Sequence, residues 1–102
     1  MTSVRRTEAA ERDLREIARQ IAVTDGRAVT ADRIIDELID KCNRLAEHSR
    51  VAVQGTAAPE IGPTVRIIPH RRWVILFRYE PHGVDILRFA DGSQDYLTWK
   101  LR

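Results

Sequence analysis

The first half of the chain carries apolar residues at the three- and four-residue spacing of an amphipathic helix. In the first such stretch, from about Glu8 to Val23, the apolar positions are Ala10, Leu14, Ile17, Ala18 and Ile21. Thr7 is placed to cap this helix, because its hydroxyl can accept a hydrogen bond from a free amide of the first turn. A second stretch, from about Ala28 to Glu47, has its apolar stripe at Ala31, Ile35, Leu38, Cys42 and Leu45. The short turn at residues 24–26 between the two predicts an antiparallel helix hairpin.

The pattern changes to alternation after a predicted loop at residues 49–63, which is interrupted by glycine and proline. Three strands are predicted, at Val65–Pro69, Arg72–Glu80 and Val84–Phe89. The middle strand places Trp73, Ile75, Phe77 and Tyr79 on one face and Val74, Leu76 and Arg78 on the other. The turn at residues 81–83 makes the last two strands an antiparallel hairpin. Residues 2–6 are able to form a short edge strand, whereas residues 96–102 show no clear period.

These elements predict a single α+β domain over residues 1–102, with the helix hairpin packed on one face of a small antiparallel sheet of three or four strands. The hairpin fills only one face of that sheet. The other face is therefore expected to meet solvent or a partner.

Composition and charge narrow the function. Apolar residues make up 43% and charged residues 31%, which is typical of a globular chain. No apolar run is long enough to cross a bilayer, no secretory signal is visible, and Cys42 is the single cysteine. A reduced, cytoplasmic location without membrane contact is therefore expected. The net charge is +2, but residues 61–102 hold 7 Lys+Arg against 4 Asp+Glu, a local net of +3. Such a surface attracts nucleic acid or an acidic protein segment, although each arginine taken alone is better explained as a solvated surface residue.

Few residues are candidates for catalysis. The five glycines are isolated, so there is no phosphate loop. His48, His70 and His82 lack metal-ligand spacing, and Cys42 lies on the apolar stripe of the second helix, so neither a metal site nor a cofactor is expected. Metal-free RNA cleavage remains open, since it needs only a proton acceptor, a proton donor and cations. The residues that could supply these groups are Arg66, His70, Arg78, Arg88, Asp95 and Tyr96. Arginines on strands also commonly cover an exposed sheet face with their stems, which is the structural alternative.

Several motifs together resemble the ParE branch of the RelE/ParE toxin superfamily. Residues 7–18 look like the first helix of those toxins, and residues 45–48 like the end of their second helix. Residues 61–66 are similar to the entry into their sheet, and the three closing motifs resemble their last two strands. These motifs are Trp73–Tyr79, Val84–Phe89 and Gly92–Asp95. They follow one another in the family's order over nearly the whole chain.

The resemblance implies the toxin of a type II toxin–antitoxin pair, bound by a ParD-like antitoxin that itself contacts the operon DNA. ParE-like members inhibit DNA gyrase without a known catalytic site, whereas RelE-like members cleave mRNA on the ribosome. Asp91 and Gln94 stand where the family often has histidine and arginine, and the sheet has no lysine. Both departures remove cations that an RNase needs, and they favour gyrase as the target with no catalytic residues, or a member of the family that has lost potency. The alternative is a RelE-like endonuclease that uses Arg66, Arg78, Arg88 and Tyr96.

Two binding surfaces are expected. An antitoxin segment would dock between the helix hairpin and the sheet, where its acids meet the acid-free basic stretch and its apolar side chains meet the groove. The residues of this surface are Arg66, Arg71, Arg72, Trp73 and Arg78. The target would bind the tail, through Tyr96, Leu97, Trp99, Lys100 and Arg102, unless the aromatic residues only seal the sheet edge. A stand-alone nucleic-acid-binding module is the rival reading, and the low net charge argues against it.

Overall fold

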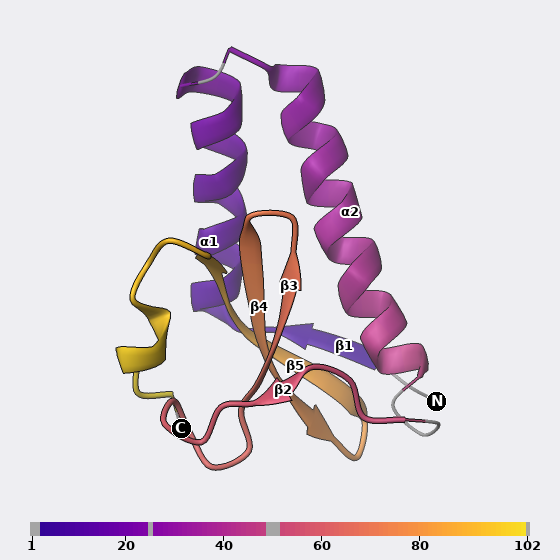
Figure 1. Cartoon of the computed structure of the whole chain (residues 1–102). Coiled ribbons are helices and arrows are strands. Elements are labelled where there is room, and N and C mark those ends of the chain that lie inside the picture. Colours follow the sequence, from indigo (N-terminus) through magenta and orange to yellow (C-terminus); the bar gives the residue numbers. More distant parts are fainter. Residues whose placement is uncertain (1–2, 25, 49–51, 102) are drawn as a thin grey trace.

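Two antiparallel helices stand beside a twisted sheet in this computed structural model, which describes residues 3–24, 26–48 and 52–101 (Figure 1). Helix α1 spans Glu8–Arg19 and continues as the π-helical turn η1, Gln20–Thr24, while α2 spans Ala28–Glu47. The Thr7 hydroxyl accepts a hydrogen bond from the Ala10 amide at 3.1 Å, as the sequence predicts for the N-terminal cap of this helix. The predicted helix hairpin is confirmed, and the change to π-helical geometry in its last turn is the difference.

Five strands form one sheet in the order β1-β5-β4-β3-β2. Their bounds are Ser3–Arg6 for β1, Thr56–Ala57 for β2, Arg66–His70 for β3, Trp73–Glu80 for β4 and Gly83–Asp91 for β5. The three predicted strands and the N-terminal edge strand are present, with ends shifted by at most two residues. Strand β2 lies inside the predicted loop and was missed, because two exposed residues carry no alternation.

The sheet is mixed, which corrects the expectation of a purely antiparallel one. Strands β2 to β5 pair antiparallel, but β1 runs parallel to β5, with Ser3 opposite Gly83 and Arg6 opposite Ile86. The direction of β1 follows from the start of α1. The Thr7 amide donates to the Ile86 carbonyl at 3.1 Å, so the chain must enter α1 at the middle of β5. Gly83 allows this approach, because a Cβ there would lie 2.2 Å from the Ser3 carbonyl oxygen.

The main core lies between the helices and the sheet. It contains the inward faces of α1 and α2 and one face of β4, with Trp73, Ile75 and Phe77. Phe77 and Ile75 are fully buried, and Trp73 is 5% exposed. The predicted alternation in β4 is confirmed, since Val74 and Leu76 point into a separate cluster on the opposite face.

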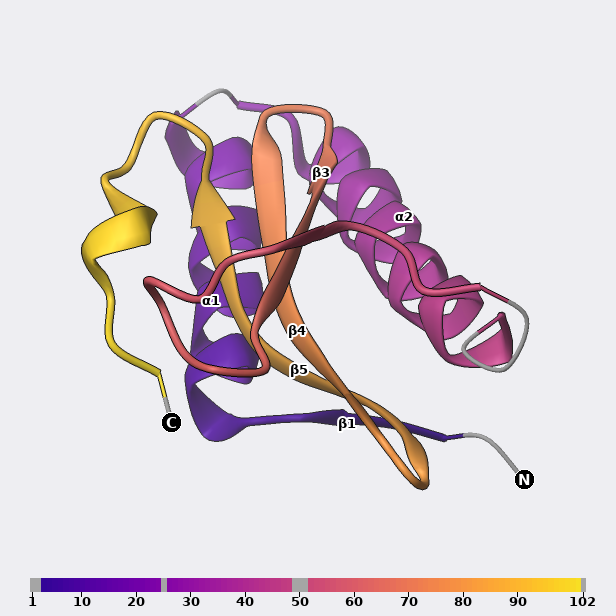
Figure 2. The same cartoon turned by 60° about the horizontal axis from the view of Figure 1, so that its bottom comes forward.

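That opposite face is not open, which corrects a second expectation. Residues 58–65 and the C-terminal tail cross it, and their apolar side chains form the second cluster with Val74 and Leu76 (Figure 2). The tail includes the 3-10 turn η2, Tyr96–Thr98, and its Leu101 amide donates to the Ile61 carbonyl at 2.8 Å. Because this domain is small, chain segments without regular structure supply the cover that a third layer would otherwise provide. No helix of the described residues is long and apolar enough to span a membrane.

Candidate functional site

The β3–β4 turn lies over the helix pair, in the layer of the sheet (Figures 1 and 2), and it carries two consecutive arginines, Arg71 and Arg72. Arg71 has φ +56°, a left-handed conformation that glycine or asparagine usually occupies. Among the described residues it is the one non-glycine with positive φ. A bidentate ion pair with Glu37 of α2 holds it there, with Nε–Oε1 at 2.7 Å and Nη2–Oε2 at 3.0 Å. Backbone strain at a side chain so firmly oriented indicates a functional position.

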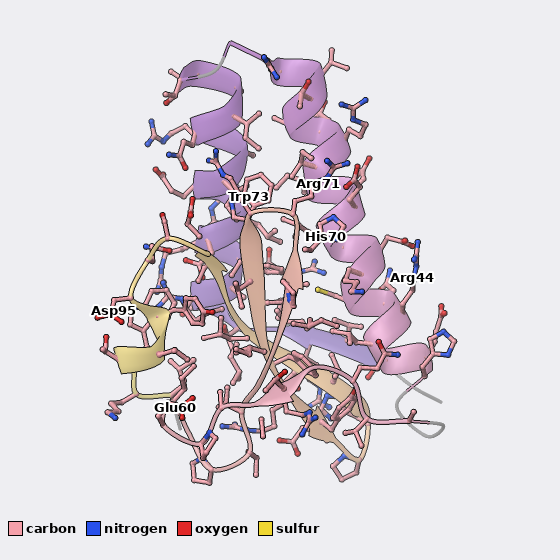
Figure 3. All side chains as sticks on the ribbon, viewed as in Figure 1. Arg44, Glu60, His70, Arg71, Trp73 and Asp95 are labelled. Carbon is pink, nitrogen blue, oxygen red and sulfur yellow. The ribbon has the colours of Figure 1, made fainter. Side chains whose placement is uncertain are left out.

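Glu37 is the anchor of this turn. Its carboxylate also accepts a hydrogen bond from the His70 ring, whose Nε2 lies 3.0 Å from Oε1. Figure 3 shows His70 and Arg71 close to each other on the side of the turn that faces α2. The hydrogen bonds from Arg71, and then from His70, lower the pKa of Glu37 to about 2. The carboxylate therefore stays ionised, and it fixes the turn against α2.

Trp73 lies directly behind the turn. The Arg72 guanidinium sits 4.8 Å from the centre of its ring, in cation–π geometry, and the Arg72 Nε lies 3.5 Å from an Asp91 carboxylate oxygen. The Asp91 carboxylate also accepts from the Ser93 amide at 2.9 Å and from the Ser93 hydroxyl at 2.8 Å. These Ser93 hydrogen bonds hold the pKa of Asp91 below its usual range. Arg72 is thus the outer cover of an otherwise buried tryptophan.

Asp13 of α1 binds the part of β5 that β1 does not reach. Its Oδ2 accepts from the Arg88 Nε at 2.7 Å and from the Phe89 amide at 2.9 Å, and its Oδ1 accepts from the Arg88 Nη2 at 3.0 Å. The hydrogen bond to Asp13 raises the pKa of Arg88. The Arg88 guanidinium also stacks 4.2 Å from the centre of the Trp99 ring, so it joins α1, β5 and the tail.

Two cavities flank Trp73. The first, of about 330 Å³, lies between α1 and β5 and has Asp13, Glu16 and Asp91 in its wall; we call it the acidic cavity. The second, of about 230 Å³, lies where the helix hairpin meets the β3–β4 turn. Its floor is Ile21, Ile34 and Trp73, its rim is Arg27, Arg71 and Arg72, and we call it the basic cavity. Both are large enough for one or two side chains of a partner.

The five residues predicted to bind an antitoxin fall into two groups. Arg71, Arg72 and Trp73 come together around the basic cavity. Arg66 and Arg78 lie toward the other end of the β3–β4 pair, where Arg66 faces Phe77 in the strand register. Each of these two is bound to a loop. Arg66 donates to the Gln54 carbonyl at 2.9 Å and the Gly55 carbonyl at 2.8 Å, and the Arg78 Nε donates to the Thr64 hydroxyl at 2.6 Å.

The four residues of the alternative RNA-cleavage hypothesis are held by separate partners. Arg66 and Arg78 bind the loops just described, and Arg88 binds Asp13. Tyr96 packs half-buried against the second cluster. Within the described part of the chain, no two of these four side chains share a hydrogen bond or an ion pair. Nor do the described residues contain a group of three or more His, Cys, Asp or Glu that could hold a metal ion.

The predicted target-binding tail is partly exposed. Leu97 is 43% exposed, and Lys100 is exposed with its Nζ donating to the Glu60 carbonyl at 3.0 Å. Tyr96 and Trp99 are half-buried against the sheet. Arg102 lies outside the described residues.

Sequence reasoning missed several residues of this site. Arg27, Glu16 and Glu37 read as ordinary charged positions of the helix hairpin, because nothing local distinguishes them from their neighbours. Their roles depend on the sheet, including the β3–β4 turn, that packs onto the helices. The one local signal was a pair of arginines at a two-residue turn, where a glycine or an asparagine is the usual choice.

Two comparisons with known proteins point to the same family. The family model described as "ParE toxin of type II toxin-antitoxin system, parDE" matches residues 4–96. Among solved structures, a chain of the "Chromosomal ParDE TA system from P. aeruginosa" is similar, with a TM-score of 0.67 and 25% sequence identity. The match covers 89% of this chain and 96% of that chain. The comparison with curated proteins gives no match.

Proposed function

The chain belongs to the ParE toxins of type II toxin–antitoxin systems, and on that premise we propose that a cognate ParD-like antitoxin neutralises it and that DNA gyrase is its target. The observation that carries the antitoxin half of the proposal is the basic cavity. It combines an apolar floor with a rim of three arginines, and it lies in the groove between helix hairpin and sheet. An acidic, amphipathic segment is the ligand that such a surface fits.

The antitoxin segment would use this surface in two ways. Its apolar side chains would fill the cavity above Trp73 and account for most of the affinity, since buried anchors dominate binding energy. Its acids would meet Arg71 and Arg72 and set the association rate and the specificity. Arg66 and Arg78 belong to the same proposed surface. They would be reached where a longer segment continues along the β3–β4 pair.

Gyrase is the preferred target because inhibition by binding needs no proton transfer. Ribonuclease chemistry requires an acid, a base and a cation that converge on one phosphate. Here Arg88 is committed to Asp13, and Arg66 and Arg78 to loop oxygens. The exposed side chains of the tail, with Leu97 and Lys100 foremost, are the proposed gyrase contact. Tyr96 and Trp99 would support them from below, and Arg102 belongs to the same predicted set.

Co-expression tests the antitoxin half. The chain is produced with and without the protein encoded by the adjacent gene, and the two are purified through a tag on one partner. We expect a stable complex, higher yield and relief of growth arrest. A toxin that gains neither yield nor a partner in this experiment contradicts the proposal.

Induction in growing cells tests the target. Gyrase inhibition is expected to bring DNA breaks and an SOS response while translation continues for the first minutes, and purified gyrase should lose supercoiling activity when the chain is added. Leu97→Asp should reduce both effects without unfolding the protein, because Leu97 is exposed. Prompt arrest of protein synthesis with mRNA cuts, lost in a folded Arg78→Ala variant, would instead favour the endonuclease.

The proposed location is the cytoplasm, where gyrase and the antitoxin are found together. No cofactor takes part. The chain would contact DNA only indirectly, through the antitoxin, and it would not contact the membrane.

A further inference from the structure

The two cavities beside Trp73 carry opposite charge. The acidic cavity has Asp13, Glu16 and Asp91 in its wall together with Arg88, so the charges of its lining are mainly negative. Each of these acids also has an ion-pair partner: Arg88 for Asp13, Arg19 for Glu16 and Arg72 for Asp91. The basic cavity has three arginines and no acid in its lining. Among the described residues Arg27 has no ion-pair partner at all, so its charge faces the cavity uncompensated.

The two cavities are parts of one surface. Trp73 lines both of them. Arg72 marks their boundary, because it lines the basic cavity while its Nε lies 3.5 Å from Asp91 of the acidic one. On the helix side the π-helical turn η1 spans the same boundary, with Gln20 in the acidic cavity and the next residue, Ile21, in the basic one.

We propose that the two cavities form one docking trough that fixes the direction of a partner segment by charge. The segment would place a basic side chain in the acidic cavity, an apolar side chain over Trp73 and an acidic side chain in the basic cavity. This inference rests on the proposed function, since the partner is the antitoxin segment that docks between hairpin and sheet. It adds the order of side chains that the segment must present.

Local geometry at the boundary supports a binding role. The first helix ends in the π-helical turn η1 where the trough passes it. The left-handed Arg71 stands on the opposite wall, in a conformation that costs free energy and is kept by Glu37. Both departures from regular geometry fall on the trough.

Opposite charges at the two ends give direction as well as affinity. A segment that enters in reverse places its acid beside Glu16 and Asp91 and its cation beside three arginines. Like charges in contact strongly disfavour that arrangement. Arg72 also leaves Trp73 covered until a partner carboxylate draws the guanidinium away from Asp91. Once Arg72 has moved, Trp73 is available as an apolar contact. Only a partner segment with an acidic side chain at this position would therefore reach it.

Charge reversal at the two ends tests the direction. Arg27→Glu reverses a residue of the basic cavity and suits its place before α2, because an acid is favourable at a helix N-terminus. Glu16→Lys reverses the acidic cavity and removes only an exposed ion pair with Arg19, which contributes little to stability. The matched controls are Arg33→Glu and Asp36→Lys, both exposed on α2 and part of neither cavity. The purified full chain is titrated against the antitoxin encoded beside it.

Each cavity variant is expected to weaken binding by about tenfold or more, while the controls bind as the unchanged chain does. A displayed library of antitoxin variants is then selected for restored binding. For Arg27→Glu, the selected antitoxin variants should have an acidic residue replaced by a basic one. For Glu16→Lys, they should have a basic residue replaced by an acidic one. The two antitoxin positions should lie on either side of an apolar residue. Cavity variants that bind within twofold of the unchanged chain, or compensating positions on the same side of the apolar residue, would overturn the trough and leave the toxin–antitoxin pairing intact. If the unchanged chain itself does not bind, the proposed function fails and the trough with it.

Discussion

Removal of the Asp13 carboxylate is expected to destabilise the protein more than any other single change at its surface. Beyond Ile86 strand β5 has no strand neighbour on the β1 side, and Asp13 takes that place for the Phe89 amide. The same carboxylate holds Arg88 through two further hydrogen bonds. Its side chain is 16% exposed, so solvent replaces these contacts only in part.

The magnitude follows from the three contacts that Asp13→Ala removes. A hydrogen bond to a charged group contributes about 1.5–3 kcal/mol, and an amide left unpaired costs about 1–3 kcal/mol. The Arg88 contribution is smaller than its geometry suggests, because its side chain is 29% exposed and can turn to water. We therefore expect a loss of about 2–3 kcal/mol in the free energy of unfolding for Asp13→Ala. Asp13→Asn keeps an oxygen for the Phe89 amide and should lose about half as much.

Urea unfolding measures the effect. With a slope of about 1–2 kcal/mol per molar urea, the midpoint of Asp13→Ala should fall by roughly 1–3 M. Hydrogen exchange at the Phe89 amide should quicken in the alanine variant and stay closer to normal in the asparagine variant. Asp36→Ala, on an exposed face of α2, is the control and should change stability by less than about 0.5 kcal/mol. An Asp13→Ala midpoint equal to that of this control would refute the reasoning. If Asp13→Ala and Asp13→Asn lose the same free energy of unfolding, the hydrogen bond to the Phe89 amide does not contribute to stability.

Three further changes have definite expected outcomes. The folded-state pKa of Glu37 is lowered to about 2 from an ordinary 4.5, so the stability that Glu37 contributes is complete above pH 4.5 and is lost as the pH falls toward 2. In an acid titration followed by circular dichroism, the stability of Glu37→Gln should therefore fall less steeply below pH 4.5 than that of the unchanged chain. An equally steep fall in both proteins would contradict this prediction. Gly83→Ala places a Cβ 2.2 Å from the Ser3 carbonyl oxygen at φ +145°, so β1 should detach, with faster hydrogen exchange in residues 3–6 and a lower melting temperature. Burial raises the pKa of the Cys42 thiol to about 12, so iodoacetamide at pH 8 should react with it in urea but scarcely in the native protein, and equal rates would refute its burial.

The sequence alone was sufficient for the elements that rest on local periodicity. The second helix was predicted with the bounds that it has, and the first from Glu8 to Val23, where the α-helix ends at Arg19 and a π-helical turn continues to Thr24. Amphipathic spacing over stretches of this length leaves no competing interpretation. Strand β4 was predicted together with its two faces, since the alternation of its eight residues separates the side chains of one core cluster from those of the other. The sequence motifs also indicated the family, and the match of the family model over residues 4–96 agrees with them.

The tertiary structure decided whatever depends on contacts between distant segments. The parallel direction of β1 follows from the Thr7–Ile86 hydrogen bond, which joins residues 79 positions apart. The cover of the second sheet face comes from residues 58–65 and the tail, which have no period of their own.

The candidate site shows the same division. Five basic or aromatic residues near one another in sequence were expected to act together, but a strand rises about 3.3 Å per residue. In the β3–β4 hairpin, Arg66 and Arg78 therefore lie far from the turn, whereas Arg71 and Arg72 lie in the turn and line the basic cavity at the helix hairpin. Arg27 and Glu16 join the site because the helices pack there. A sequence states which side chains exist and how they repeat, whereas the folding of distant segments onto one another determines which of them share a cavity.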